Sequence, residues 1–128
     1  MTYYMATSLD AGFEATVARV EAALKEEGFG VLTRIDVRET MKAKLDQDFR
    51  PYVILGACNP KLAYEALQLE DKVGTMLPCN VVVQQPVPGR IEVAAIDPVA
   101  SMRTIDNPRL KEAAMAVREK LSRVIASL

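Results

Sequence analysis

The sequence contains no histidine, and this absence removes several kinds of chemistry at once. Without an imidazole the chain forms neither a Ser-His-Asp nor a Cys-His catalytic group, and it has no histidine ligand for zinc or iron. Any catalysis would depend on Cys, Lys, Tyr, Asp or Glu side chains, or on a bound cofactor whose identity the sequence does not give. The composition argues against ordinary hydrolytic enzymes and leaves open whether the protein is an enzyme.

Cysteine is scarce, because Cys58 and Cys79 are the two thiols among 128 residues. Two cysteines are too few for the disulfide framework of a small secreted module, so a reducing compartment, the cytoplasm, is expected. The two residues do not form a Cys-x-x-Cys pair, which argues against a thioredoxin-type centre and against a zinc knuckle. Four thiolates would require two subunits together, and no metal site is expected.

The chain also lacks an excess of either charge, with 16 basic and 17 acidic residues. The richest basic stretch, from Arg34 to Arg50, is interleaved with acidic residues. A protein that binds a phosphate backbone needs a coherent basic face, so we expect no nucleic-acid partner. No apolar run approaches the roughly 18 residues that span a bilayer, and the amino terminus does not resemble a secretory signal, so no membrane contact is expected.

The chain does contain alternating strand and helix patterns that fit a single domain over residues 1–128. Strands are predicted at 3–5, 29–36, 52–58, 78–85 and 90–97. Helices are predicted at 13–24, with Ser8 or Asp10 as the cap and Gly28 as the stop, on the surface at 38–45, after Asn59-Pro60, and after Asn107-Pro108. No helix is predicted between 98 and 106.

This order of elements predicts the α+β class: a mostly antiparallel sheet of about five strands, with helices packed on one face. A turn at Pro86–Gly89 joins two adjacent strands as a hairpin. The amphipathic carboxy-terminal helix, six methionines and the stretch from Val73 to Leu77 indicate surplus apolar surface. A homodimer would bury that surface, so we expect one.

Two segments pair a cysteine with an asparagine at the boundary of a predicted strand: Cys58-Asn59-Pro60 and Cys79-Asn80. Cys58 ends one strand directly before a helix, where the helix dipole and free backbone N–H groups favour a thiolate. Cys79 begins the next strand. If these strands pair antiparallel, the end of one lies beside the start of the other, and the two thiols and two asparagine amides converge.

Three functions fit these residues. The first is binding of a small molecule or cofactor in a pocket formed by Cys58, Asn59, Pro60, Cys79 and Asn80. The second is thiol-based redox or sulfur chemistry, in which Cys58 reacts and Cys79 resolves the product. The third is a non-catalytic interaction module, in which both cysteines are simply buried and the asparagines serve as a helix cap and a turn former. We favour the first, because a thiol beside amide donors suits binding and no acid–base constellation accompanies it.

A second candidate is the charged segment from Arg34 to Arg50. Lys42, Lys44 and Arg50 could hold an anionic ligand, with Asp46 or Asp48 as a base. A solvated surface held by weak ion pairs explains the same residues more simply. The glycines at 28 and 30 precede a strand and do not follow one, so they do not form a nucleotide-binding loop.

The chain also carries a series of motifs in a fixed order: Gly28-Phe29-Gly30-Val31-Leu32-Thr33, Ile35-Asp36-Val37, Asp48-Phe49-Arg50-Pro51-Tyr52, Leu55-Gly56-Ala57-Cys58-Asn59-Pro60, Leu77-Pro78-Cys79-Asn80-Val81 and Ala95-Ile96-Asp97-Pro98. In these motifs the chain resembles the uncharacterised bacterial and archaeal family called domain of unknown function 302. The resemblance runs over nearly the whole chain.

The resemblance implies a compact α+β fold with an antiparallel sheet, similar in topology to one repeat of the TATA-binding protein fold. That similarity concerns architecture and implies no DNA binding. The family motifs include Cys58, Asn59, Pro60, Cys79 and Asn80, which the analysis of single residues also selects. The family brings no known activity, substrate or cofactor.

Overall fold

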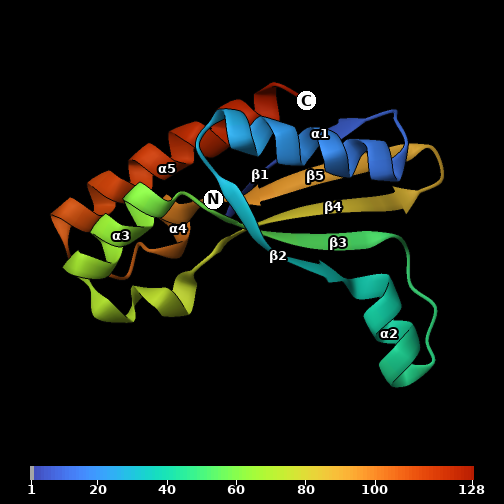
Figure 1. The fold of residues 1–128 in the computed structure, drawn as a ribbon, viewed down its shortest axis with the longest axis horizontal. Helices are drawn as coiled ribbons and strands as arrows, with labels where there is room; N and C mark the ends of the chain where they lie inside the picture. Colours follow the sequence, from blue (N-terminus) through green and yellow to red (C-terminus); the bar gives the residue numbers. More distant parts are fainter. Residues whose placement is uncertain (1) are drawn as a thin grey trace.

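The computed structural model describes residues 2–128, which form one antiparallel sheet and a set of helices (Figure 1). The α+β class and the antiparallel sheet are confirmed. In chain order the elements are β1 (Tyr4–Leu9), α1 (Phe13–Glu26), β2 (Gly30–Asp36), α2 (Val37–Leu45), β3 (Tyr52–Cys58), α3 (Pro60–Leu69), the 3₁₀ helix η1 (Asp71–Met76), β4 (Cys79–Val87), β5 (Arg90–Ile96), α4 (Pro98–Ser101) and α5 (Pro108–Ala126).

The five strands lie in the order β1-β5-β4-β3-β2, and every neighbouring pair is antiparallel. The β4–β5 hairpin turns at Gly89, whose φ of 82° is the left-handed conformation that glycine adopts without a steric penalty. The apolar run Tyr52–Cys58 predicts an interior strand, and β3 does lie between β2 and β4. This order leaves β1 and β2 as the two edges of the sheet.

The main core lies between one face of the sheet and helices α1 and α5, which lie side by side above the sheet in Figure 1. Apolar residues at helical spacing put Val17, Val20 and Leu24 of α1 on this face, and all three are buried. Alternate residues of the central strands complete the core, among them Val53, Leu55, Val81, Val83, Ile91 and Val93. Helix α5 contributes Leu121, Val124 and Ile125.

A smaller apolar cluster lies beyond the sheet, at the end where β3 finishes and β4 begins. It joins α3, η1, α4 and the first half of α5, which group together on the left of Figure 1. Its buried residues are Ala66, Val73, Met102, Leu110 and Ala114. The candidate site described below lies between this cluster and the sheet.

The start of α1 differs from the prediction. Gly12 is the N-cap and makes no side-chain hydrogen bond, whereas the sequence predicts Ser8 or Asp10 as the cap. The prediction is wrong because Ser8 belongs to β1, which continues to Leu9 and pairs with β5 along its length. The predicted end of α1 is confirmed, since Gly28 follows it with a φ of 85°.

Two further expectations are corrected by the helices. The stretch after Asp97 contains the short helix α4, where the sequence predicted only a connection. The expected surplus apolar surface is found only in part: the apolar stripe of α5 and Val73 are largely buried within one chain, whereas Met76 is 37% exposed and Met115 is 58% exposed. Among residues 2–128, no helix combines the length and the apolar character needed to cross a bilayer.

Candidate functional site

A cavity of about 330 Å³ lies between the end of the sheet and the smaller cluster. This volume falls within the range of roughly 300–1,000 Å³ typical of small-molecule pockets. Its wall is formed by residues of strands β2, β3 and β4, of helices α3, α4 and α5, and of the 3₁₀ helix η1. The residues that line it are Phe29, Leu32, Ala57, Cys58, Asn59, Leu62, Ala63, Ala66, Leu67, Gly74, Leu77, Pro78, Cys79, Pro98, Met102, Leu110, Ala113, Ala114 and Val117.

Among residues 2–128, those that line this cavity include no charged side chain. Its polar side chains are the thiols of Cys58 and Cys79 and the amide of Asn59. All other lining side chains are hydrocarbon, apart from the thioether of Met102. A cavity with this wall suits an apolar molecule. A charged group buried there would lose its hydration and would gain no oppositely charged partner in exchange.

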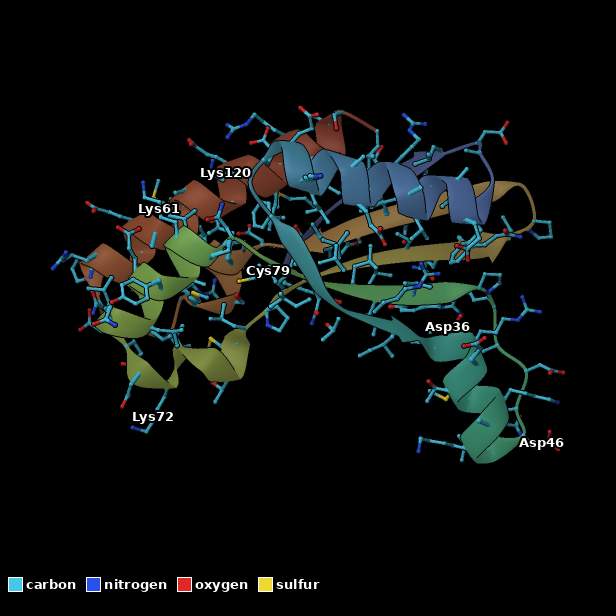
Figure 2. The ribbon with its side chains drawn as sticks, in the orientation of Figure 1. Asp36, Asp46, Lys61, Lys72, Cys79 and Lys120 are labelled. Carbon is cyan, nitrogen blue, oxygen red and sulfur yellow. The ribbon has the colours of Figure 1, made fainter. Side chains whose placement is uncertain are left out.

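The two cysteines reach the cavity from neighbouring strands. Strands β3 and β4 pair antiparallel with Ala57 opposite Cys79, and Cys58 is the last residue of β3. Both thiols line the cavity, and Cys58 is close enough to Cys79 to influence its ionisation. Figure 2 shows Cys79 between the sheet and helices α3 and α4. The predicted convergence of the two thiols is therefore confirmed. Both are free cysteines, Cys58 half-buried and Cys79 buried.

Cys79 is in an environment that keeps its thiol protonated. Burial raises the pKa of the Cys79 thiol from 9.0 to about 11, and the neighbouring Cys58 adds to the rise. Burial acts by penalising the charged thiolate, and a second thiolate close by repels it. The thiol is accordingly neutral at physiological pH, and it is a poor nucleophile in that form.

Asn59 holds the start of α3 as the sequence predicts. Its Oδ1 accepts a hydrogen bond from the backbone N–H of Leu62 at 3.2 Å, which is the contact of a helix N-cap. Its Nδ2 lies close to Gly28, where an added Cβ would approach to 3.1 Å. Pro60 occupies the first helical position and is exposed. It is not among the cavity residues, so its role is to start α3.

Asn80 lies on the opposite face of the sheet from the cavity. It pairs with Gly56 in the β3–β4 ladder, is exposed, and lines a separate hollow with Tyr4 and Tyr52. Adjacent residues of a strand point to opposite faces, so Cys79 and Asn80 cannot both enter one pocket from a regular strand. The prediction that both asparagine amides converge is wrong for Asn80.

A β-bulge in the edge strand brings Leu32 to the cavity. Val31 pairs with Ala57 and Thr33 with Gly56, which leaves Leu32 as the extra residue. A bulge of this kind redirects a side chain, and Leu32 is 68% exposed while it lines the cavity. Together with Leu67, which is 41% exposed, it forms an apolar edge of the opening.

The strand that leads to Cys58 is held tightly on its other face. The side chains of Thr33 and Pro78 occupy the space that a Cβ on Gly56 would need, with the ring Cγ of Pro78 at 2.8 Å from that position. Glycine is therefore required at residue 56 for β2 and the residue before β4 to approach β3 this closely. The Leu77–Pro78 peptide bond beside it is cis.

The charged segment forms a solvated surface. Lys42 makes ion pairs with Asp46 at 3.0 Å and Asp48 at 3.5 Å, and all three side chains are mostly exposed. The Nε–H of Arg50 donates to Gln84 at 2.8 Å, and its guanidinium stacks on Phe49 at 4.4 Å. Lys44 is exposed on α2, a helix that buries none of its residues. These contacts fit the simpler interpretation of the segment.

Several cavity residues were not predicted from the sequence. Met102 follows α4, whose start has a recognisable signal: Asp97 precedes Pro98 and accepts hydrogen bonds from Val99 N and Ala100 N. This is the same cap-and-proline pattern as Asn59-Pro60, so it could have been found. Leu32 and Ala63 had no local signal, because they meet the cysteines only through tertiary packing.

Comparison with known proteins gives a consistent result. The family model described as "Domain of unknown function DUF302" matches residues 5–128. The crystal structure of an uncharacterized conserved DUF302 protein from Bacillus stearothermophilus is similar to this chain, with 33% sequence identity, 98% of each chain covered and a TM-score of 0.90. No curated protein matches. The resemblance predicted from the motifs is confirmed, and it comes without an assigned activity.

Proposed function

The chain belongs to the DUF302 family, and we propose that it is a single-domain cytoplasmic protein that binds an uncharged, apolar small molecule or cofactor in the cavity beside Cys58 and Cys79. One observation carries the proposal: a cavity of about 330 Å³ has no charged side chain on its wall. A charged ligand would lose its hydration there without gaining a partner, whereas an apolar ligand gains from burial. The thiol of Cys79 is neutral at physiological pH and adds no charge to the wall.

Asn59 supplies the polar contact that orients such a ligand. Its Oδ1 is engaged with the backbone N–H of Leu62, so its Nδ2 group is the part of the amide that remains to donate to a ligand. A carbonyl, ether or hydroxyl oxygen at one end of the ligand would accept from it. The preferred ligand is an apolar body with one uncharged oxygen, since few polar groups in an apolar pocket usually fix orientation.

Thiol chemistry is the second candidate, because the two cysteines share one cavity. In that case Cys58, which is half-buried, is the residue that reacts first. The pKa of about 11 for Cys79 weakens the redox proposal, because a resolving thiol must ionise to attack. We therefore rank binding above redox or sulfur transfer, and we rank both above a packing role alone, which would not require an open cavity.

The proposal also includes a homodimer. The apolar surface that supports it is not the stripe of α5, which is largely buried within one chain, but lies on the uncovered face of the sheet. This part of the proposal is independent of the ligand, because the cavity is complete within one chain.

Filling the cavity tests the proposal. Ala63 lines the cavity from α3 and is half-buried, so Ala63→Phe places a ring in the binding space. Ala22→Phe is the matched control, because Ala22 is exposed on α1 and away from the cavity. The neutral dye N-phenylnaphthylamine, whose fluorescence rises in apolar surroundings, is titrated into each protein.

We expect wild type and Ala22→Phe to bind the dye alike, and Ala63→Phe to bind it at least tenfold more weakly. Thermal melting of each variant establishes that it remains folded. Equal dye binding by a folded Ala63→Phe variant, or no binding by wild type, would overturn the proposal. Tighter binding of an anionic dye of the same size would overturn the claim that the ligand is uncharged.

A further inference from the structure

In the part of the chain that the structure describes, one face of the sheet has no layer of helices over it. Figure 1 shows α1 and α5 over the other face, and α2 extending away from the sheet on the opposite side to them. An unbroken row of apolar side chains crosses the uncovered face through all five strands. Cross-strand pairing links its members in turn: Ala6 with Ala94, Ala94 with Val82, Val82 with Ile54, and Ile54 with Ile35.

These five residues, which we call the apolar row, remain accessible to solvent. Ile35 is 48% exposed and Ala6 is exposed, while the three central members are half-buried between neighbouring side chains. A hollow of about 340 Å³ includes Val82 and Ala94 and is bordered by Tyr4 and Tyr52. Tyrosine is enriched at the energetic centres of protein interfaces, and contiguous apolar surface of this kind marks a binding face.

We propose that the apolar row is where a second copy of this chain docks, so that two sheets pack face to face about a two-fold axis. The inference rests on the dimer included in the proposed function, and it identifies the face. A two-fold interface brings one patch against the same patch, so the patch must complement itself. An apolar row meets that condition, and aligned sheets of this type pack about 10 Å apart.

The charges beside the apolar row also complement themselves. The Nε–H of Arg50 donates to Gln84 at 2.8 Å, and the Gln84 amide donates to Glu92 at 2.9 Å. The edge of the apolar row therefore carries the cation of Arg50 and the anion of Glu92, joined through the amide of Gln84. Two copies of this edge can lie against each other without net electrostatic repulsion. A formal net charge of −1 on each chain adds little long-range repulsion. A strongly charged partner would meet no excess of opposite charge on this face.

The size of the face also fits a dimer that includes α2. Five strands about 4.8 Å apart and six residues of about 3.4 Å give a sheet face of roughly 500 Å². A stable interface buries about 800 Å² on each partner, so the sheet alone is small. Helix α2 buries none of its residues, and its Leu45 is 63% exposed. A dimer through this face would therefore have to include contacts from α2 as well as from the sheet.

Lysine substitutions on the apolar row test the inference. Ile35→Lys lies on an edge strand, where lysine is well tolerated, and Ala94→Lys lies on β5, one strand in from the other edge. Met115→Lys is the matched control, because Met115 is an apolar residue of α5 that is 58% exposed. Mass in solution is measured by light scattering and sedimentation over a range of protein concentrations, and folding is checked by thermal melting.

We expect wild type and Met115→Lys to dimerise, and both row variants to raise the dimer dissociation constant at least tenfold. Wild type that stays monomeric at every concentration would overturn the dimer, whatever the dye titration shows. Row variants that fold and dimerise like wild type would overturn the choice of this face. If Met115→Lys alone loses the dimer, the interface lies on the side of the sheet covered by α1 and α5, and the choice of the apolar row is overturned.

Discussion

Cys79 is the direct cross-strand partner of Ala57, and Cys58, the last residue of β3, lines the same cavity. The two thiols are not equivalent within it. Cys79 is 7% exposed and Cys58 is half-buried, and the pKa of Cys79 is raised to about 11, chiefly by burial. Because the two thiols differ in burial and in protonation, two measurements on them can test the described site without knowledge of the ligand.

The stability of the protein should fall between about pH 9 and about pH 11 because of Cys79. A thiol whose pKa is raised in the folded state binds its proton more tightly there than in the unfolded chain. Its contribution is therefore fully present below the unfolded pKa of 9.0 and is lost as pH rises through the folded pKa of about 11. The loss amounts to about 2 kcal/mol by about pH 10.5. Urea unfolding at about pH 8 and about pH 10.5 measures it.

The control for this prediction is Cys79→Ala, which removes the titrating thiol. Its free energy of unfolding should change less between the two pH values than that of wild type, by about the same 2 kcal/mol. Lysines and tyrosines titrate alike in both proteins and cancel in the comparison. An identical pH dependence in wild type and variant would mean that Cys79 is not the buried neutral thiol described here.

Alkylation of the native protein should label Cys58 well before Cys79. At about pH 8 a thiol with a pKa of about 11 is ionised to roughly one part in a thousand, and only the thiolate reacts. Burial slows Cys79 further. Peptide mass analysis after timed alkylation should give a rate at least tenfold higher for Cys58. Faster labelling of Cys79 would contradict the burial and pKa on which the ranking of functions rests, and would favour thiol chemistry.

Replacing Gly56 by alanine should lower the free energy of unfolding by about 1–3 kcal/mol, because the new Cβ collides with Thr33 and Pro78. Gly30→Ala is the matched control. It lies on β2 with no atom within 4 Å of its added Cβ, so its effect should be near zero. Chemical denaturation compares the two. Equal losses of stability at the two positions would show that Thr33 and Pro78 can move away from a Cβ at residue 56.

Removing the helix cap at Asn59 should destabilise the protein by about 1 kcal/mol, because Asn59→Ala leaves the Leu62 N–H without its acceptor. Asn59→Asp retains a capping oxygen and should recover most of that loss. Thermal or chemical denaturation of both variants checks this. If alanine is tolerated as well as aspartate, the side chain is not held by its capping bond, and its Nδ2 is not fixed at the cavity.

The meeting of Cys58 with Cys79 could be predicted because it depends on local patterns. An apolar run ends at Cys58, a β-branched run begins at Cys79, and antiparallel pairing brings those ends together. The position of Asn80 shows the limit of this reasoning. A shift of one residue along a strand changes the face, so grouping Cys79 with its neighbour ignored the alternation of the strand.

The rest of the cavity could not be predicted from single segments. Leu32 points to the opening because a bulge interrupts β2, and the sequence alternation across 29–36 gives no sign of it. Ala63 of α3 and Ala113 of α5 lie opposite the sheet only once the helices have packed. Such contacts depend on the packing of elements that are distant in the sequence. The start of α4 differs, because Asp97-Pro98 is a local cap-and-proline pattern from which the helix can be predicted.

The location of a bound neutral dye tests the central claim most directly. Two-dimensional amide NMR spectra are recorded with and without N-phenylnaphthylamine. Binding in the cavity predicts that the amide signals of Cys58, Asn59 and Ala63 shift, and that those of Asn80 and Val82 on the other face of the sheet do not. Shifts confined to Asn80 and Val82, or no shifts at a dye concentration that saturates the fluorescence, would contradict the assignment of this cavity as the binding site.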